Sequence, residues 1–184
     1  MIEQLMNLVR EHASDTIINN PSVPNQHNEA AVSATTAAIS EGLSKAFAQG
    51  QVGGLLALLG GKTTATNTNP IVSQIVGALT HNLTAQCGVS SSNAQSVAAN
   101  LIPMILTKLA ARTADPANSS FTLNGIFNHL SGGQTGSIDF TAALSRLDKD
   151  GDGDVDFSDI LGQFGSSQNV AGLVGKLAGN FFNR

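Results

Sequence analysis

The sequence predicts an all-α protein, and two observations support this fold class. Apolar residues recur at the i, i+3, i+4, i+7 spacing of one helix face through nearly the whole chain. Segments rich in proline, asparagine or glycine separate these amphipathic stretches, as expected for turns between helices. The chain has 184 residues, of which 41% are hydrophobic, so it is long enough to bury a core without disulfide bonds. Its single cysteine, Cys87, excludes an internal disulfide.

Two helices are expected in the first part of the chain. The first begins near Ile2, and the second begins soon after Pro24 and ends before Gly50, a suitable C-terminal cap. A glycine-rich apolar segment, residues 54–61, follows the second helix. The apolar faces of the two helices consist of Ile2, Leu5, Met6, Val9 and Ala13, and of Val32, Ile39, Leu43, Ala46 and Phe47.

Residues 62–69 contain no apolar residue except Ala65, so we expect them to form a linker, because little in them offsets the entropy of ordering. Pro70 suits the first turn of a third helix, which Gly88 ends. The apolar face of this helix consists of Ile71, Ile75, Leu79 and Leu83.

A fourth helix should begin at one of the serines 90–92 and end at Asp115 and Pro116. Its apolar residues are Val97, Leu101, Ile102, Ile105, Leu106 and Leu109. Pro103 lacks a backbone N–H, so we expect it to kink or split this helix near Asn100. A short apolar helix from about Thr122 to Leu130 follows, closed by two glycines.

The two halves of this helical region look like copies of one small bundle. Each half has a long amphipathic helix, a polar turn, an alanine-rich helix and a short closing segment. The predicted division is a first copy over 1–61, a linker over 62–69, a second copy over 70–135, and a C-terminal region over 136–184. Two unrelated helix sets of similar Ala/Gly-rich composition remain the alternative, because biased composition imitates repeats.

Four short stretches of the helical region are characteristic: Asn20-Pro21-Ser22-Val23-Pro24-Asn25, Gly88-Val89-Ser90, Ile102-Pro103-Met104 and Leu130-Ser131-Gly132-Gly133. With these stretches, most of residues 1–135 resembles the YidB-like bacterial helical domain of unknown function. The resemblance implies an all-helical fold and no assigned activity.

Charge is sparse and concentrated at one place. Asp, Glu, Lys and Arg make up 12% of the chain, against about 25% in ordinary globular proteins. Six of the 13 acidic residues lie within positions 148–159, so the net charge of −4 is a local −5 on a remainder of +1. The acidity therefore indicates a site rather than an acidic surface.

Several functional classes lack their usual signals. The chain has no basic cluster and no Trp or Tyr to stack on nucleic-acid bases, and its longest apolar run is far too short to span a bilayer. The N-terminus lacks the features of a secretory signal, which favours a soluble cytoplasmic protein. No Ser-His-Asp or acid–base constellation stands out, so we expect that the protein is not an enzyme. The histidines, His12, His27, His81 and His129, are too scattered for a zinc site.

Residues 148–159 read Asp-Lys-Asp-Gly-Asp-Gly-Asp-Val-Asp-Phe-Ser-Asp and fit the D-x-[DN]-x-[DN]-G pattern of an EF-hand loop. Alternate side chains of such a loop converge on one point, where a hard dication needs six to eight oxygens. Gly153 allows the sharp turn that directs the carbonyl group of Asp154 to the ion. The predicted Ca²⁺ ligands are Asp148, Asp150, Asp152, Asp154, Asp156 and Asp159.

The flanks resemble the EF-hand family over about residues 139–164. Phe140, Leu144 and Leu147 lie on the predicted incoming helix, and Phe157, Ile160, Leu161 and Phe164 on the outgoing one. Asp159 replaces the usual Glu at position 12, so we expect weaker Ca²⁺ binding or more room for Mg²⁺. Aspartate at this position is also the dockerin pattern, but dockerins need two such loops and no second one is present.

The sequence therefore predicts a non-catalytic calcium-binding protein, in which one ion orders the C-terminal region. The alternative is a helical interaction or scaffold protein in which the metal is incidental. A final amphipathic helix needs an apolar partner, which favours a homodimer or a protein partner at this end of the chain. Its apolar residues are Val170, Leu173, Val174, Leu177 and Phe181.

Overall fold

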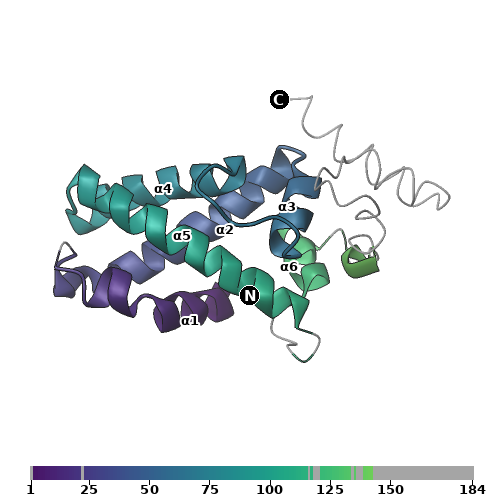
Figure 1. The fold of residues 1–184 in the computed structure, drawn as a ribbon, viewed down its shortest axis with the longest axis horizontal. Helices are drawn as coiled ribbons and strands as arrows, with labels where there is room; N and C mark the ends of the chain where they lie inside the picture. The colour runs from purple at the N-terminus through teal and green to yellow at the C-terminus, as the bar shows by residue number, and fades with distance from the viewer. Residues whose placement is uncertain are drawn as a thin grey trace.

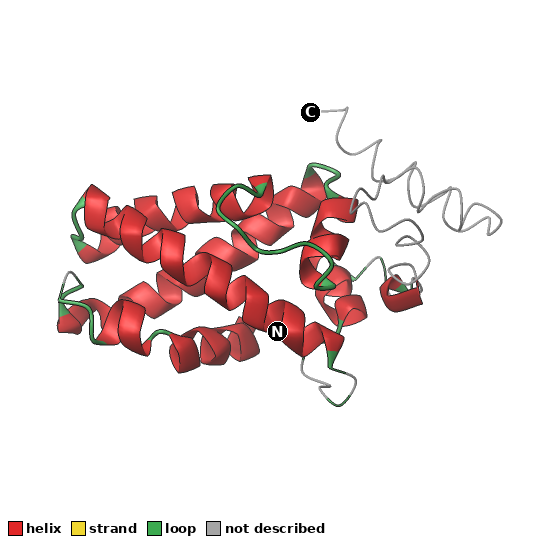
Figure 2. Cartoon of the chain, in the orientation of Figure 1, coloured by secondary structure: helices red, strands yellow, loops and turns green. Residues whose placement is uncertain are grey.

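The computed structural model describes residues 2–21, 23–115, 117, 121–133, 135 and 139–142. Helices and loops make up this described part, and it contains no strand (Figure 2). The prediction of an all-α fold is confirmed.

In the described part of the chain, six α-helices follow one another, with two short irregular helices between the first two. They are α1 (Ile2–His12), α2 (Asn28–Ala48), α3 (Val52–Leu59), α4 (Pro70–Cys87), α5 (Ser91–Ala114) and α6 (Leu123–Leu130). A π-helical turn, Ser14–Ile18, and a 3₁₀ turn, Asn25–His27, separate α1 from α2. The predicted apolar faces of α4 and α5 are confirmed, since all the residues of these faces are buried. Those of α1 and α2 are confirmed in part: Met6 and Phe47 are only partly buried, and Ile2 at the start of α1 is 39% exposed.

Both ends of α4 follow from its local sequence. The side chain of Asn69 accepts a hydrogen bond from the backbone N–H of Ile71 at 3.0 Å, and Pro70 occupies the first turn. At the other end, Gly88 takes a left-handed conformation with φ of 64°, which a residue without a Cβ adopts at little energetic cost. The predicted roles of Pro70 and Gly88 are confirmed.

Helix α2 crosses α4 very closely, and Figure 1 shows α4 beside α5 on the same side of the bundle. Small residues recur every four positions on the buried part of α2: Ala34, Ala38, Gly42 and Ala46. A Cβ built at Gly42 would lie 2.3 Å from Cγ1 of Ile75 on α4. The absence of a side chain at Gly42 therefore sets the distance between these two helices.

Nearly all buried hydrophobic residues of α1 to α6 belong to a single hydrophobic cluster. Leu8 and Ile39 from the first half contribute to it together with Leu79 and Leu83 from the second. The helices of 1–61 and 70–135 thus share one core, while their origin by duplication stays a prediction.

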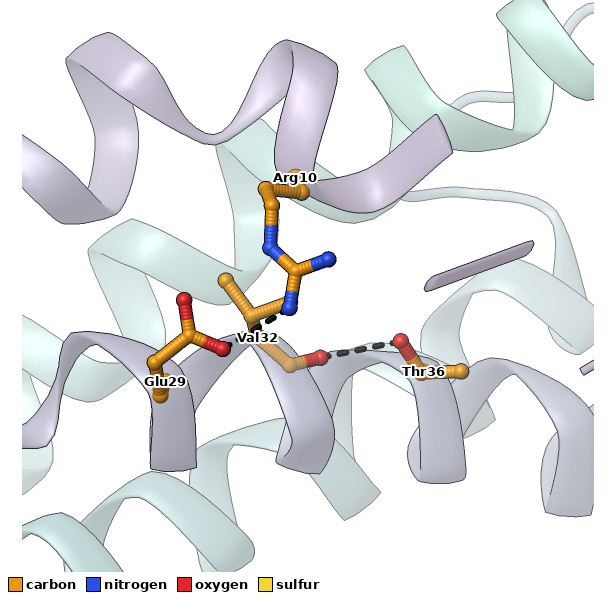
Figure 3. A network of polar contacts seen from close by, with 4 residues as sticks. All are labelled: Arg10, Glu29, Val32 and Thr36. Carbon is orange, nitrogen blue, oxygen red and sulfur yellow. Dashed lines mark hydrogen bonds and ion pairs between the residues drawn. The ribbon is translucent and has the colours of Figure 1, made fainter. Parts of the chain in front are cut away.

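Helix α1 is joined to its neighbours by ion pairs at the surface. Nη2 of Arg10 lies 2.8 Å from Oε2 of Glu29 on α2, as Figure 3 shows. Nη2 of Arg112 on α5 lies 2.6 Å from Oε2 of Glu11. Farther along α2, the hydroxyl group of the buried Thr36 donates to the carbonyl group of Val32 at 2.9 Å (Figure 3). This bond allows a polar residue to lie in the core.

Helix α5 runs unbroken from Ser91 to Ala114 through Pro103, so the predicted split near Asn100 is wrong. Because Pro103 has no N–H, the carbonyl group of Ala99 loses its usual donor four residues later. The side chain of Asn67 supplies a replacement, with Nδ2 donating to this carbonyl oxygen at 3.1 Å. Residues buried on both sides of Pro103 also hold the helix in the core.

The segment over 62–69 connects α3 to α4 and follows the surface of α5. Its one apolar residue, Ala65, is buried in the common core, and Asn67 bonds to α5. The backbone N–H groups of Lys62 and Thr63 both donate to the carbonyl group of Ala57 at the end of α3. The predicted linker is therefore attached to the bundle along its length.

None of the described helices combines the length and the apolar character needed to cross a membrane.

We expect Gly42→Ala to reduce the free energy of unfolding by about 1–3 kcal/mol, because the new methyl group overlaps Ile75. Urea denaturation followed by circular dichroism measures this loss. Gly77→Ala on α4 is the matched control: its Cβ meets nothing within 4 Å, so the change should stabilise the protein by about 0.5–1 kcal/mol. An Ile75→Ala background should remove the penalty at position 42, and a fully stable Gly42→Ala protein would contradict the close crossing.

We expect Asn67→Ala to reduce the free energy of unfolding by about 0.5–1.5 kcal/mol, because it removes the donor to the carbonyl group of Ala99. In a Pro103→Ala background the loss should be smaller, since the new N–H can bond to the same carbonyl group. A double-mutant cycle measured by urea denaturation gives the coupling. Thr64→Ala, at an exposed position of the same segment, is the control, and equal losses in both backgrounds would disprove the exchange of donors.

Candidate functional site

All six predicted Ca²⁺ ligands lie outside the described residues. They are Asp148, Asp150, Asp152, Asp154, Asp156 and Asp159. The outgoing helix and the final amphipathic helix lie outside them as well. The structure does describe how the chain approaching this loop is attached to the bundle, through α6 and residues 139–142.

Helix α6 is a short helix that lies at the same end of the bundle as α3 (Figure 1). The hydroxyl group of Thr122 caps its N-terminus by accepting from the N–H of Gly125 at 3.0 Å. Leu123, Ile126 and Phe127 are buried on one face, so this helix is fixed to the core.

An aromatic series links α2 to the chain entering the predicted loop. The ring of Phe127 on α6 meets that of Phe47 on α2 edge to face, with centroids 6.1 Å apart. On its other side, Phe127 stacks with Phe140, with centroids 4.2 Å apart and planes inclined by 16°. Phe140 is 3% exposed, which makes it part of the common core. Each aromatic contact of this kind adds about 0.5–1.5 kcal/mol beyond the burial of its surface.

The residues around Phe140 also form a polar attachment. Oδ1 of Asn124 on α6 accepts from the backbone N–H of Phe140 at 2.7 Å, and Nδ2 of Asn124 lies 3.3 Å from Oδ1 of Asp139. The same oxygen of Asp139 accepts from the N–H groups of Thr141 and Ala142 at 3.0 and 3.1 Å. Asp139 is thus the N-cap of a helical segment whose described part is 140–142. Its carboxylate also has the favourable charge for a helix N-terminus.

The turn after α6 is held by two hydroxyl groups. Oγ of Ser131 lies 2.9 Å from Oγ1 of Thr135 and accepts from the backbone N–H of Thr135 at 3.2 Å. Ser131 is 8% exposed and Thr135 3%, so both hydroxyl groups are in the interior and partnered. Gly132 and Gly133 between them take positive φ values. The turn brings the chain back toward α6.

The other candidates from the sequence do not assemble into a site. Within the residues that the structure describes, no group of three or more His, Cys, Asp or Glu side chains could hold a metal ion. Cys87 is 1% exposed, and burial raises the pKa of its thiol. Because the thiolate is the reactive form, this change makes Cys87 a poor nucleophile. The interpretation of Cys87 as a core residue is confirmed.

The sequence pointed to Phe140 as an apolar residue of an incoming helix, but not to its contacts. The pattern does not identify Asn124 and Phe127 as its partners, since the spacing along α6 carries no information about contacts with residue 140. An available signal was Asp139 directly before an apolar helical pattern, which is the usual place of an N-cap.

Compared with known proteins, the chain matches no family model, no curated protein and no solved structure.

Proposed function

We propose that this protein binds one Ca²⁺ ion in the loop over 148–159 and that the ion orders the C-terminal region, with no catalytic step. The observation that carries the proposal is the spacing of six aspartates around Gly153, which fits an EF-hand loop. The EF-hand pattern assigns the side chains of Asp148, Asp150 and Asp152 and the carbonyl group of Asp154 to the ion. Asp156, directly or through a water, and Asp159 complete the set.

The chemistry of the donor set favours a hard cation. Every ligand offers an oxygen atom, and the loop contains no His or Cys, the usual ligands of zinc. Two carboxylates about 4 Å apart repel each other by about 4 kcal/mol at an effective dielectric constant of 20. A divalent cation at the centre of the loop would convert this repulsion into attraction.

The described structure supports the proposal at the start of the incoming helix. The predicted flank begins at about residue 139, and Asp139 is the N-cap of the segment 140–142. Phe140, the first predicted apolar residue of that helix, packs on Phe127 in the core. A loop entered from such a fixed point has less conformational freedom to lose when it closes around an ion.

Binding of this kind would stabilise the folded protein. For a ligand that binds only the folded state, a hundredfold excess over Kd adds about 2.7 kcal/mol. With a Kd on the order of 10⁻⁵ M, about 1 mM Ca²⁺ provides this excess, whereas with a Kd near 10⁻³ M the gain at the same concentration falls to about 0.4 kcal/mol. The chain has only 3 methionines, fewer than a Met-rich target groove needs, so structural stabilisation fits better than sensing.

A second candidate function is association through the C-terminal apolar residues. It is favoured by the helical spacing of Val170, Leu173, Val174, Leu177 and Phe181. Sedimentation velocity with Ca²⁺ and with EGTA separates the two candidates. A dimer that forms only with Ca²⁺ favours the calcium-binding function, whereas a dimer that is indifferent to Ca²⁺ favours a scaffold.

Isothermal titration of the full chain should show one Ca²⁺ ion bound per molecule, and thermal unfolding should move to higher temperature in millimolar Ca²⁺. Asp150→Asn should weaken binding by about tenfold or more, because it removes a charged ligand from the loop. Glu41→Gln is the matched control, since it removes one negative charge from the exposed surface of α2. Binding equal to that of the control, or no binding by the unaltered chain, would contradict the proposal.

Asp159→Glu should strengthen Ca²⁺ binding and increase the preference for Ca²⁺ over Mg²⁺. The longer side chain can present both carboxylate oxygens to the larger ion, whereas Mg²⁺ keeps a compact octahedral shell. Parallel titrations with the two ions measure the change. An unchanged or lower Ca²⁺ affinity would show that Asp159 does not occupy position 12 of an EF-hand loop.

A further inference from the structure

The last described residues before the proposed loop are attached to α6 by a group of contacts that we call the Phe140 anchor. It consists of Phe140, Asp139 and their partners Asn124 and Phe127. Its apolar half is the stacked pair Phe127–Phe140. Its polar half is the side chain of Asn124, which contacts both the N–H of Phe140 and the carboxylate of Asp139. Asn124 and Phe127 lie on α6, Asp139 and Phe140 follow this helix in the chain, and the first predicted ligand, Asp148, follows Phe140 by eight positions.

The anchor continues into the centre of the bundle. Phe127 is fully buried and also contacts Phe47 near the end of α2, the helix that crosses α4 at Gly42. A packed core has few voids and transmits a displacement instead of absorbing it. A change in the position of Phe140 therefore alters the packing of Phe127 against α2.

We infer that the Phe140 anchor couples Ca²⁺ binding in the loop to the stability of the whole helical bundle, so that the ion regulates opening of the body as well as order in the C-terminal region. This inference rests on the proposed calcium binding. Coupling between two events is reciprocal: if the bound ion favours the anchored helix by a given factor, the anchor favours the ion by the same factor.

The lone cysteine provides a probe of the bundle far along the chain from the loop. Cys87 lies at the end of α4 and is 1% exposed, so a thiol reagent reaches it only when the bundle opens. In mild urea, where labelling follows global unfolding, its rate measures the population of the open state. If loop and bundle unfold together, a hundredfold excess of Ca²⁺ over Kd should slow the labelling by about 100-fold.

The test compares the full chain with Phe140→Ala and with Leu83→Ala. Calorimetry gives the Kd of each protein for Ca²⁺, and Cys87 labelling is then measured without the ion and at a hundredfold excess over that Kd. Leu83 is fully buried on α4 and lies outside the anchor, so its replacement destabilises the bundle without disturbing Phe140. We expect about 100-fold slowing in the unaltered and Leu83→Ala proteins, and less than about threefold in Phe140→Ala.

The outcomes separate this inference from the function on which it rests. If the unaltered chain binds no Ca²⁺, the proposed function fails and the inference fails with it. If it binds Ca²⁺ but Cys87 labelling does not slow, or if Phe140→Ala binds Ca²⁺ and keeps the full slowing, the inference is overturned and the calcium-binding function stands. Should Phe140→Ala not fold, Asn124→Ala removes the polar half of the anchor alone and should reduce the slowing while the loop still binds the ion.

Discussion

The close crossing of α2 and α4 at Gly42 is the constraint on which the bundle depends. Only a residue without a side chain allows Ile75 to approach the α2 backbone at this point, and the small residues above and below it on α2 extend the contact. Helix α4 also packs against α5, and α2 also packs against α1. Near the C-terminal end of α2, Phe47 contacts Phe127 of α6. Larger residues at these positions of α2 would push α2 and α4 apart and leave Leu79 and Leu83 of α4 poorly packed.

Much of the fold could be predicted from local patterns. Apolar periodicity predicts most of the buried residues on α1, α2, α4 and α5, and Pro70 and Gly88 predict where α4 begins and ends. Both features depend only on neighbours a few residues away in the sequence. The continuity of α5 could not be predicted in this way. The donor that replaces the missing N–H of Pro103 comes from Asn67, which lies 32 residues before its acceptor Ala99, and only the folded arrangement brings Asn67 and Ala99 together.

In the candidate site, too, the local features could be predicted from the sequence and the long-range contacts could not. The identity and order of the aspartates are local information, and the N-cap at Asp139 is of the same kind. The attachment of this segment to α6 depends on Asn124 and Phe127, which have no regular spacing from residue 140 and carry no motif. Periodicity along one helix carries no information about side chains that join two elements.

The burial of Phe140 has a consequence for how this protein can be divided or recombined. A polypeptide that stops after the Ser131–Thr135 turn would present the flat face of Phe127 to water, and a foreign sequence grafted there would need an aromatic residue of its own to cover it. Any cut intended to isolate the bundle therefore belongs beyond residue 142. In evolutionary terms, a sequence that replaced the chain after residue 142 would leave the interior intact only if Phe140 and its neighbours were kept.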